Sequence, residues 1–146
     1  MAPLAPIVQV IKMAKVERPP VKAVLVVDDE ATIRGLERRV LEESGYEIAE
    51  AADGQQAIDY LSDGRPLALL VADLDMPVLS GDKMVSKVRA LRPDLKVLFV
   101  TAHIDRLMDA RPLWEGEAFL EKPFTINGLR EAVSLLLYGS TKRTAV

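Results

Sequence analysis

The chain has 146 residues, no cysteine and a formal net charge of −3. A chain of this length buries enough apolar surface to fold as one domain without disulfides, and the lack of cysteine fits a reducing compartment. The weak negative charge argues against nucleic-acid binding, which needs a basic surface. No apolar run reaches the roughly 20 residues of a membrane-spanning helix, and the N-terminus does not resemble a signal peptide. We therefore expect a cytoplasmic protein that binds neither nucleic acid nor membrane.

Residues 1–20 are predicted to be an N-terminal extension or linker. Prolines stand at both ends of this segment, and four apolar residues have helical spacing between them: Leu4, Ile7, Val8 and Ile11. The segment is either a mobile linker or an amphipathic helix that docks on this domain or on a partner. Pro19 and Pro20 cannot continue a helix and favour an extended chain, so they mark the boundary of the next domain.

Residues 21–139 are predicted to form one domain, in which short apolar runs alternate with helical patterns. The apolar runs are predicted strands, and they end near Val27, Ala51, Asp73, Ala102 and Lys122. This alternation is typical of βα units. The runs VLVV, LALLV and VLFV are apolar at both alternating sets of positions, as in central parallel strands with helices on both faces. The predicted fold is therefore a doubly wound α/β sandwich.

The predicted helices differ in the clarity of their signals. The first ends at Ser44-Gly45, the second runs towards Gly64, and the third ends before Pro93. The fourth is expected to be short or frayed, because its segment contains Pro112 and has little periodicity.

The last helix has the clearest pattern. It is predicted to begin at a Thr125 or Asn127 cap and to end at Gly139. Residues 140–146 are then a short polar tail.

Polar side chains gather where the predicted strands end. Parallel strands bring their carboxyl ends to one edge of the sheet, where doubly wound folds bind ligands. This edge collects Asp28, Asp29, Asp73, Thr101 and Lys122. Taken singly, each has an ordinary explanation, such as a helix cap, a strand hydroxyl or a surface charge. Their occurrence at successive strand ends favours a site.

Three ionised carboxylates in one place need a positive partner. At about 4.5 Å and an effective dielectric constant near 20, each pair repels by on the order of 3 to 4 kcal/mol. Mg²⁺ fits best, because it prefers oxygen ligands and often bridges to phosphate. Lys122 and Thr101 add an ammonium group and a hydroxyl donor that suit a phosphoryl group, and an aspartate can be the nucleophile in phosphoryl transfer.

Four motifs together resemble the CheY-like receiver domain of two-component response regulators. They are VLVVDDE, VADLDMPVLSG, FVTA and FLEKPF, in this order and spacing. The most specific combination is D-x-x-M-P-x-x-x-G from Asp73 to Gly81, with T-A and K-P downstream. The resemblance extends from about Lys22 to Tyr138. It implies a flavodoxin-like, five-stranded parallel sheet with the strand order 2-1-3-4-5.

The resemblance also implies a role for each acid. Asp73 would be the phosphoacceptor. Mg²⁺ would be held directly by Asp29 and Asp73, through water by Asp28, and by the backbone carbonyl of Asp75. The side chain of Asp75 would then be free to point towards the mouth of the site.

The remaining roles concern the bound phosphoryl group and its signal. Lys122 would pair with the phosphoryl oxygens, and Thr101 would hydrogen-bond them and draw Phe119 inward as a switch. Phe119 as an ordinary core aromatic is the alternative. The protein would then be a signalling domain and not an enzyme. Its expected partners are a histidine kinase or phosphotransfer protein and a downstream protein target, and a homodimer is left open.

Several alternatives remain at this point. The motif DLD also resembles the haloacid-dehalogenase phosphatases, in which Asp73 would be the nucleophile and Asp75 the general acid of a phosphohydrolase. A receiver that only binds partners is a third hypothesis. The chain is either a free-standing regulator or the terminal receiver of a hybrid kinase. His103 is a bystander or a rate-tuning residue, and Trp114 is a loop anchor or part of a partner surface.

Overall fold

A computed structural model describes residues 21–76, 79–110 and 113–139. The predictions for residues 1–20, for Pro112 and for residues 140–146 fall outside these ranges. Within the described part of the chain, no helix is both long enough and apolar enough to cross a membrane.

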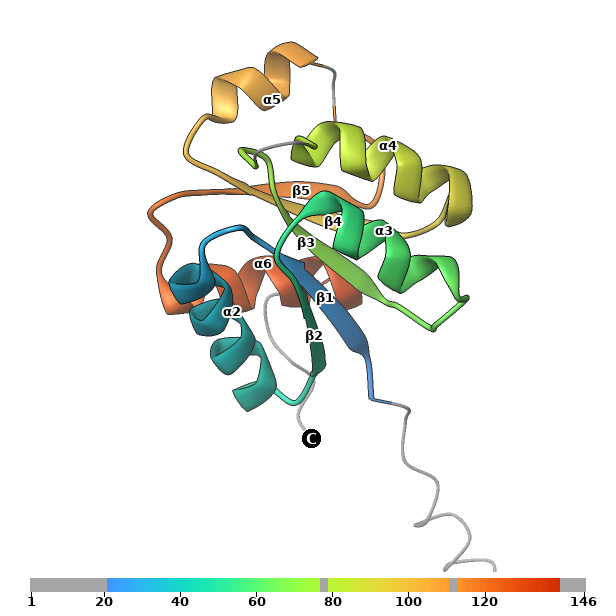
Figure 1. Ribbon diagram of the computed structural model, residues 1–146. Coiled ribbons are helices and arrows are strands. Elements are labelled where there is room, and N and C mark those ends of the chain that lie inside the picture. The colour runs from blue at the N-terminus through green and yellow to red at the C-terminus, as the bar shows by residue number, and fades with distance from the viewer. Residues whose placement is uncertain (1–20, 77–78, 111–112, 140–146) are drawn as a thin grey trace, which may run out of the picture.

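Five parallel strands form one sheet in the order β2-β1-β3-β4-β5 (Figure 1). The strands are β1 (Ala23–Val27), β2 (Glu47–Ala51), β3 (Leu69–Asp73), β4 (Lys96–Thr101) and β5 (Glu117–Glu121). The helices are α2 (Ala31–Glu43), α3 (Gly54–Ser62), α4 (Gly81–Leu91), α5 (Ile104–Ala110) and α6 (Ile126–Tyr138). The predicted fold and strand order are confirmed, and each strand ends within one residue of its predicted end.

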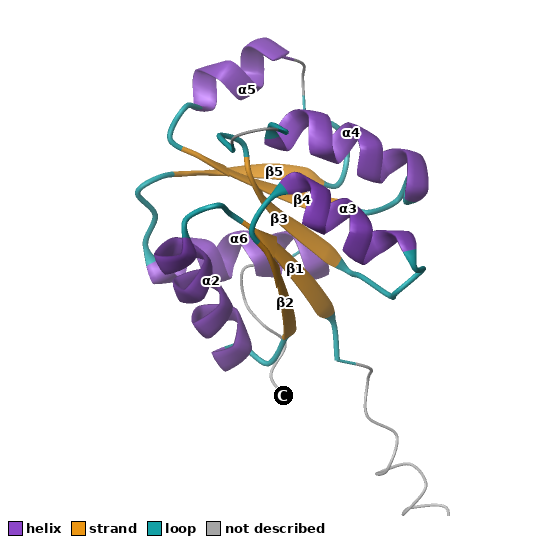
Figure 2. Cartoon of the chain, viewed as in Figure 1, coloured by secondary structure: helices purple, strands orange, loops and turns teal. Residues whose placement is uncertain are grey.

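Helices cover both faces of the sheet (Figure 2). Alternate residues of the central strands point to opposite faces, so the sheet separates two apolar cores. In β3, Leu70 and Ala72 pack with α3 and α4, whereas Leu69 and Val71 pack with α2 and α6. All five residues of β3 are buried, as its continuous apolar run predicts. The burial of both faces leaves the carboxyl ends of the strands as the place where polar groups gather.

The helix ends follow the predicted signals. Helix α4 ends two residues before Pro93, and α5 has only 7 residues, as its weak pattern indicates. The hydroxyl of Thr125 accepts a hydrogen bond from the Gly128 N–H, so Thr125 and not Asn127 caps α6. Gly139 ends α6 with φ at 71°, a left-handed conformation that glycine adopts without strain.

Candidate functional site

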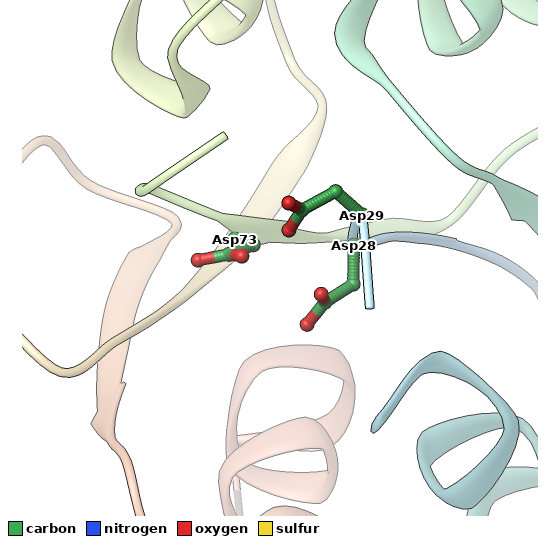
Figure 3. A group of neighbouring side chains, drawn as sticks. All are labelled: Asp28, Asp29 and Asp73. Carbon is green, nitrogen blue, oxygen red and sulfur yellow. The ribbon is translucent and has the colours of Figure 1, made fainter. Parts of the chain in front are cut away.

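Three carboxylates meet at the carboxyl end of the sheet. Asp28 follows β1 directly, Asp73 is the last residue of β3, and these two strands are neighbours in the sheet. One carboxylate oxygen from each of Asp28, Asp29 and Asp73 lies within 4.8 Å of the others (Figure 3). Asp28 and Asp73 are buried, whereas Asp29 is exposed. The predicted acidic cluster is therefore open to solvent on the side of Asp29.

Lys122 brings a positive charge into this cluster from the loop after β5. Its Nζ lies 3.1 Å from Asp28 Oδ2 and 3.5 Å from Asp73 Oδ2. The backbone N–H of Lys122 donates to the carbonyl of Thr101, which ties this loop to the end of β4. Burial lowers the pKa of Lys122, but the hydrogen bond to Asp28 and the nearby carboxylate charges outweigh it and raise the pKa above its usual value. Lys122 is therefore a cation at neutral pH.

The charge balance leaves Asp73 with an unusual pKa. Burial raises the pKa of Asp73 from 3.8 to about 6, and the charges of Asp28 and Asp29 act in the same direction. The N–H of Asp75 and the ammonium group of Lys122 oppose this rise. A bound cation would also lower this pKa, because it favours the ionised form. At neutral pH the Asp73 carboxyl group is therefore ionised in most molecules, and the ionised form is the one that can act as a nucleophile.

The Thr101 hydroxyl makes hydrogen bonds to Asp75 and His103 in this structure. This buried hydroxyl donates to Asp75 Oδ2 at 3.2 Å and accepts a hydrogen bond from the N–H of His103 at 2.8 Å. The side chain of Asp75, which was expected to point towards the mouth of the site, accepts this hydrogen bond from Thr101. The backbone N–H of Asp75 donates to Asp73 Oδ1 at 3.0 Å, so Asp75 is held to both residues.

Gly81 sets how closely α4 approaches the end of β3. A Cβ atom at this position would clash with the backbone carbonyl of Asp73 and would lie 2.8 Å from the Cα of Leu74. The N–H of Gly81 donates to the carbonyl of Leu74 at 3.0 Å. Glycine at this position therefore lets the chain enter α4 directly behind Asp73.

Two aromatic residues, one in β5 and one just before it, are exposed. Phe119 lies opposite Phe99 on the edge strand β5, and 40% of its surface is exposed, so it belongs to neither core. Its movement as a switch stays a prediction. Trp114 is 53% exposed, but its backbone N–H donates to Glu117 Oε1 and the centre of its ring lies 5.6 Å from the guanidinium carbon of Arg89. These contacts support its role as a loop anchor.

A fourth carboxyl group, which the motifs of the sequence did not indicate, lies beneath the site. Glu37 on α2 is 1% exposed, and neither of its carboxyl oxygens has a hydrogen-bond partner among the residues that the structure describes. Burial, followed by the charge of Asp28, raises the pKa of Glu37 from 4.5 to about 8, although Lys122 opposes the rise. The available signal was its position, three and four residues before the buried Val40 and Leu41.

Comparison with known proteins decides the family of this site. The pattern of the family described as Response regulator receiver domain matches residues 24–134. The chain belongs to the response regulator receiver family. Both the resemblance predicted from its motifs and the assignment to two-component signalling are confirmed.

The relatives of this chain differ in how much of their own length it matches. It is 31% identical over 116 residues to Sporulation initiation phosphotransferase F of Bacillus subtilis, covering 78% of this chain and 92% of the relative. It is 32% identical over 116 residues to Sensor kinase CckA of Brucella abortus, covering 78% of this chain but only 12% of that kinase. Among solved structures, the response regulator protein TrrA of Thermotoga maritima, in complex with Mg(2+)-BeF, has a TM-score of 0.69 and 33% identity. That match covers 80% of this receiver and 100% of TrrA.

Proposed function

We propose that this receiver accepts a phosphoryl group on Asp73 and thereby changes the surface that it presents to a partner protein. The observation that carries the proposal is the position of Lys122, whose ammonium group reaches both Asp28 and Asp73 inside the acidic cluster. An Asp73 carboxylate oxygen attacks the phosphorus of a phosphohistidine or of a small acyl phosphate. The bond from phosphorus to the leaving group breaks, and the leaving group departs with the electron pair.

The donor set fits Mg²⁺, because three carboxylates supply hard oxygen ligands and one of them is exposed to solvent. Asp29 and Asp73 would hold the ion directly, Asp28 through water, and Asp75 through its backbone carbonyl. When bound, Mg²⁺ neutralises the repulsion between the carboxylates and the incoming phosphoryl group. The proposal accounts for a cluster of three carboxylates whose mutual repulsion Lys122 offsets only in part.

The other residues act after transfer. After transfer, the negative charge lies on the phosphoryl oxygens bonded through Asp73. Lys122 is close enough to Asp73 for its ammonium group to pair with these oxygens. The Thr101 hydroxyl then donates a hydrogen bond to the phosphoryl group, and Phe119 moves inward on the neighbouring strand. The receiver acts in the cytoplasm, and its partners are a cognate histidine kinase or phosphotransfer protein, a downstream protein target and, as an open alternative, a second copy of the chain. The receiver assists its own phosphorylation and dephosphorylation and turns over no other substrate.

Incubation with acetyl phosphate and Mg²⁺, followed by intact mass measurement, tests this function. We expect one phosphoryl group per chain, no incorporation when a chelator removes Mg²⁺, and negligible steady hydrolysis of p-nitrophenyl phosphate. Rapid multiple turnover of the aryl phosphate would instead support the phosphohydrolase alternative, with Asp75 as its general acid. A chain that stays unlabelled in the presence of Mg²⁺ and also fails to hydrolyse the aryl phosphate would contradict both.

Replacement of Asp29 by alanine separates the metal from the phosphoacceptor. Because Asp29 is exposed, the variant should stay folded, but it should bind Mg²⁺ about ten-fold more weakly or worse and be labelled more slowly. Calorimetric titration with Mg²⁺ and thermal unfolding measure the two effects. Asp59→Ala, which removes an exposed carboxylate from α3, is the matched control. Equal Mg²⁺ affinities of the two variants would contradict the proposed role of Asp29.

A further inference from the structure

The hydroxyl of Thr101 is fully engaged before any phosphoryl group arrives. It donates to Asp75 Oδ2 at 3.2 Å and accepts from the N–H of His103 at 2.8 Å. A hydroxyl group has one proton, so it donates to one acceptor at a time. Thr101 is 0% exposed, so bulk water cannot replace a partner that it loses.

We propose that the Asp75 carboxylate is a latch that holds Thr101 in the unphosphorylated state by accepting a hydrogen bond from its hydroxyl group. The proposal rests on the proposed function in one respect: a phosphoryl group on Asp73 is the competing acceptor. Thr101 must break its bond to Asp75 before it reaches that group. Asp75 is thus a positioning residue that favours the resting state.

The latch lies on the loop that directly follows the proposed phosphoacceptor at the end of β3. The Asp75 N–H donates to Asp73 Oδ1, which fixes the backbone of Asp75 next to the reacting carboxylate. Thr101 is the last residue of the neighbouring strand β4. It follows Val100, the residue that pairs with Asp73 of β3. The two acceptors that compete for Thr101 are therefore two residues apart in the chain, and the choice between them does not require a distant element to move first.

The strength of the contact is enough to shift a conformational equilibrium. A hydrogen bond to an ionised carboxylate is stronger than one to a neutral group. His103 Nε2 also lies 3.9 Å from Asp75 Oδ2, but the His103 side chain is 60% exposed and water can screen it. The buried Thr101 hydroxyl is therefore the contact on which the latch depends. A dianionic phosphoryl group overcomes it because it offers the same proton a more negative acceptor.

A charge effect alone is the competing explanation, since the Asp75 carboxylate also repels an anionic phosphoryl group. A double-mutant cycle separates the two, because only the latch requires the hydroxyl of Thr101. The four proteins are the natural chain, Asp75→Ala, Thr101→Ala and the double variant. None of these changes removes the backbone carbonyl of Asp75, the expected metal ligand. The measured quantity is the affinity for beryllofluoride, a phosphoryl mimic, at saturating Mg²⁺.

We expect Asp75→Ala to tighten beryllofluoride binding about ten-fold when Thr101 is present, which corresponds to about 1.4 kcal/mol. In the Thr101→Ala background the same change should alter binding by less than about two-fold, the usual limit for uncoupled sites. Asp75→Asn keeps an acceptor oxygen but loses the charge, so its gain should be smaller than that of Asp75→Ala. Equal gains with and without Thr101, or equal gains for Asn and Ala, would show that charge alone acts and would overturn the latch.

A second measurement needs neither metal nor phosphate. In the metal-free natural chain, three-bond couplings to the Thr101 methyl group should report one χ1 rotamer. In Asp75→Ala the couplings should move towards a rotamer average, and the His103 N–H resonance should shift. Unchanged couplings would overturn the latch. If no variant binds beryllofluoride, the proposed function fails, and this measurement on the free protein still decides the latch.

Discussion

Replacement of Asp73 by asparagine should abolish phosphoryl incorporation from acetyl phosphate. The amide has nearly the shape of the carboxylate but is not a nucleophile, so the mass of the treated chain should stay that of the free protein. Asp75→Asn is the matched control, because it makes the same chemical change two residues away and should still be labelled. Labelling of the Asp73→Asn chain to the same level would place the phosphoacceptor elsewhere.

The same variant tests the charge balance of the site through stability. The folded-state pKa of Asp73 is raised to about 6 from 3.8, so ionisation of Asp73 opposes folding and its cost grows as pH rises between these values. Asp73→Asn should therefore raise the free energy of unfolding of the metal-free protein at pH 7 but not at pH 3.5. Urea unfolding in the presence of a chelator measures this difference. A variant that is less stable at pH 7 would contradict a net cost of ionising the buried Asp73 carboxyl group.

Replacement of Glu37 by leucine or glutamine should stabilise the protein at neutral and alkaline pH. The pKa of Glu37 is about 8 in the folded chain, against 4.5 for the exposed group. Between these values the folded state holds a proton that the unfolded state has lost, so the free energy of unfolding falls as pH rises. At about 1.4 kcal/mol per pH unit, the loss from pH 4.5 to pH 8 is on the order of 4 kcal/mol. Both variants should lack this pH-dependent loss in the free energy of unfolding.

Urea unfolding at pH 5 and pH 8, with a chelator present, measures this slope. The control is Glu43→Gln, which removes an exposed carboxylate from the same helix. Leucine should stabilise more than glutamine, because a buried amide without partners keeps a desolvation cost that an apolar side chain lacks. If Glu37→Gln and Glu43→Gln lose stability equally between the two pH values, Glu37 is not the buried titrating group.

The sequence by itself determines the fold and the gathering of the site residues. The apolar runs VLVV, LALLV and VLFV predict buried parallel strands because both faces of each run are apolar. Once these strands are parallel, their carboxyl ends share one edge, so Asp28, Asp73 and Thr101 lie along that edge. That their strands are neighbours followed from the strand order that the family resemblance implies, which the structure confirms.

The tertiary structure alone decides which polar groups contact which. Asp75 and Thr101 are 26 residues apart, and their hydrogen bond depends on the path of the loop after β3 and on two side-chain rotamers. Glu37 is a charged residue in sequence, but its place on the inner face of α2 buries it beside Asp28 and Lys122. Periodicity specifies the direction of a side chain from its own helix or strand. What it meets there is set by the opposing element, and that contact arises only when the elements pack.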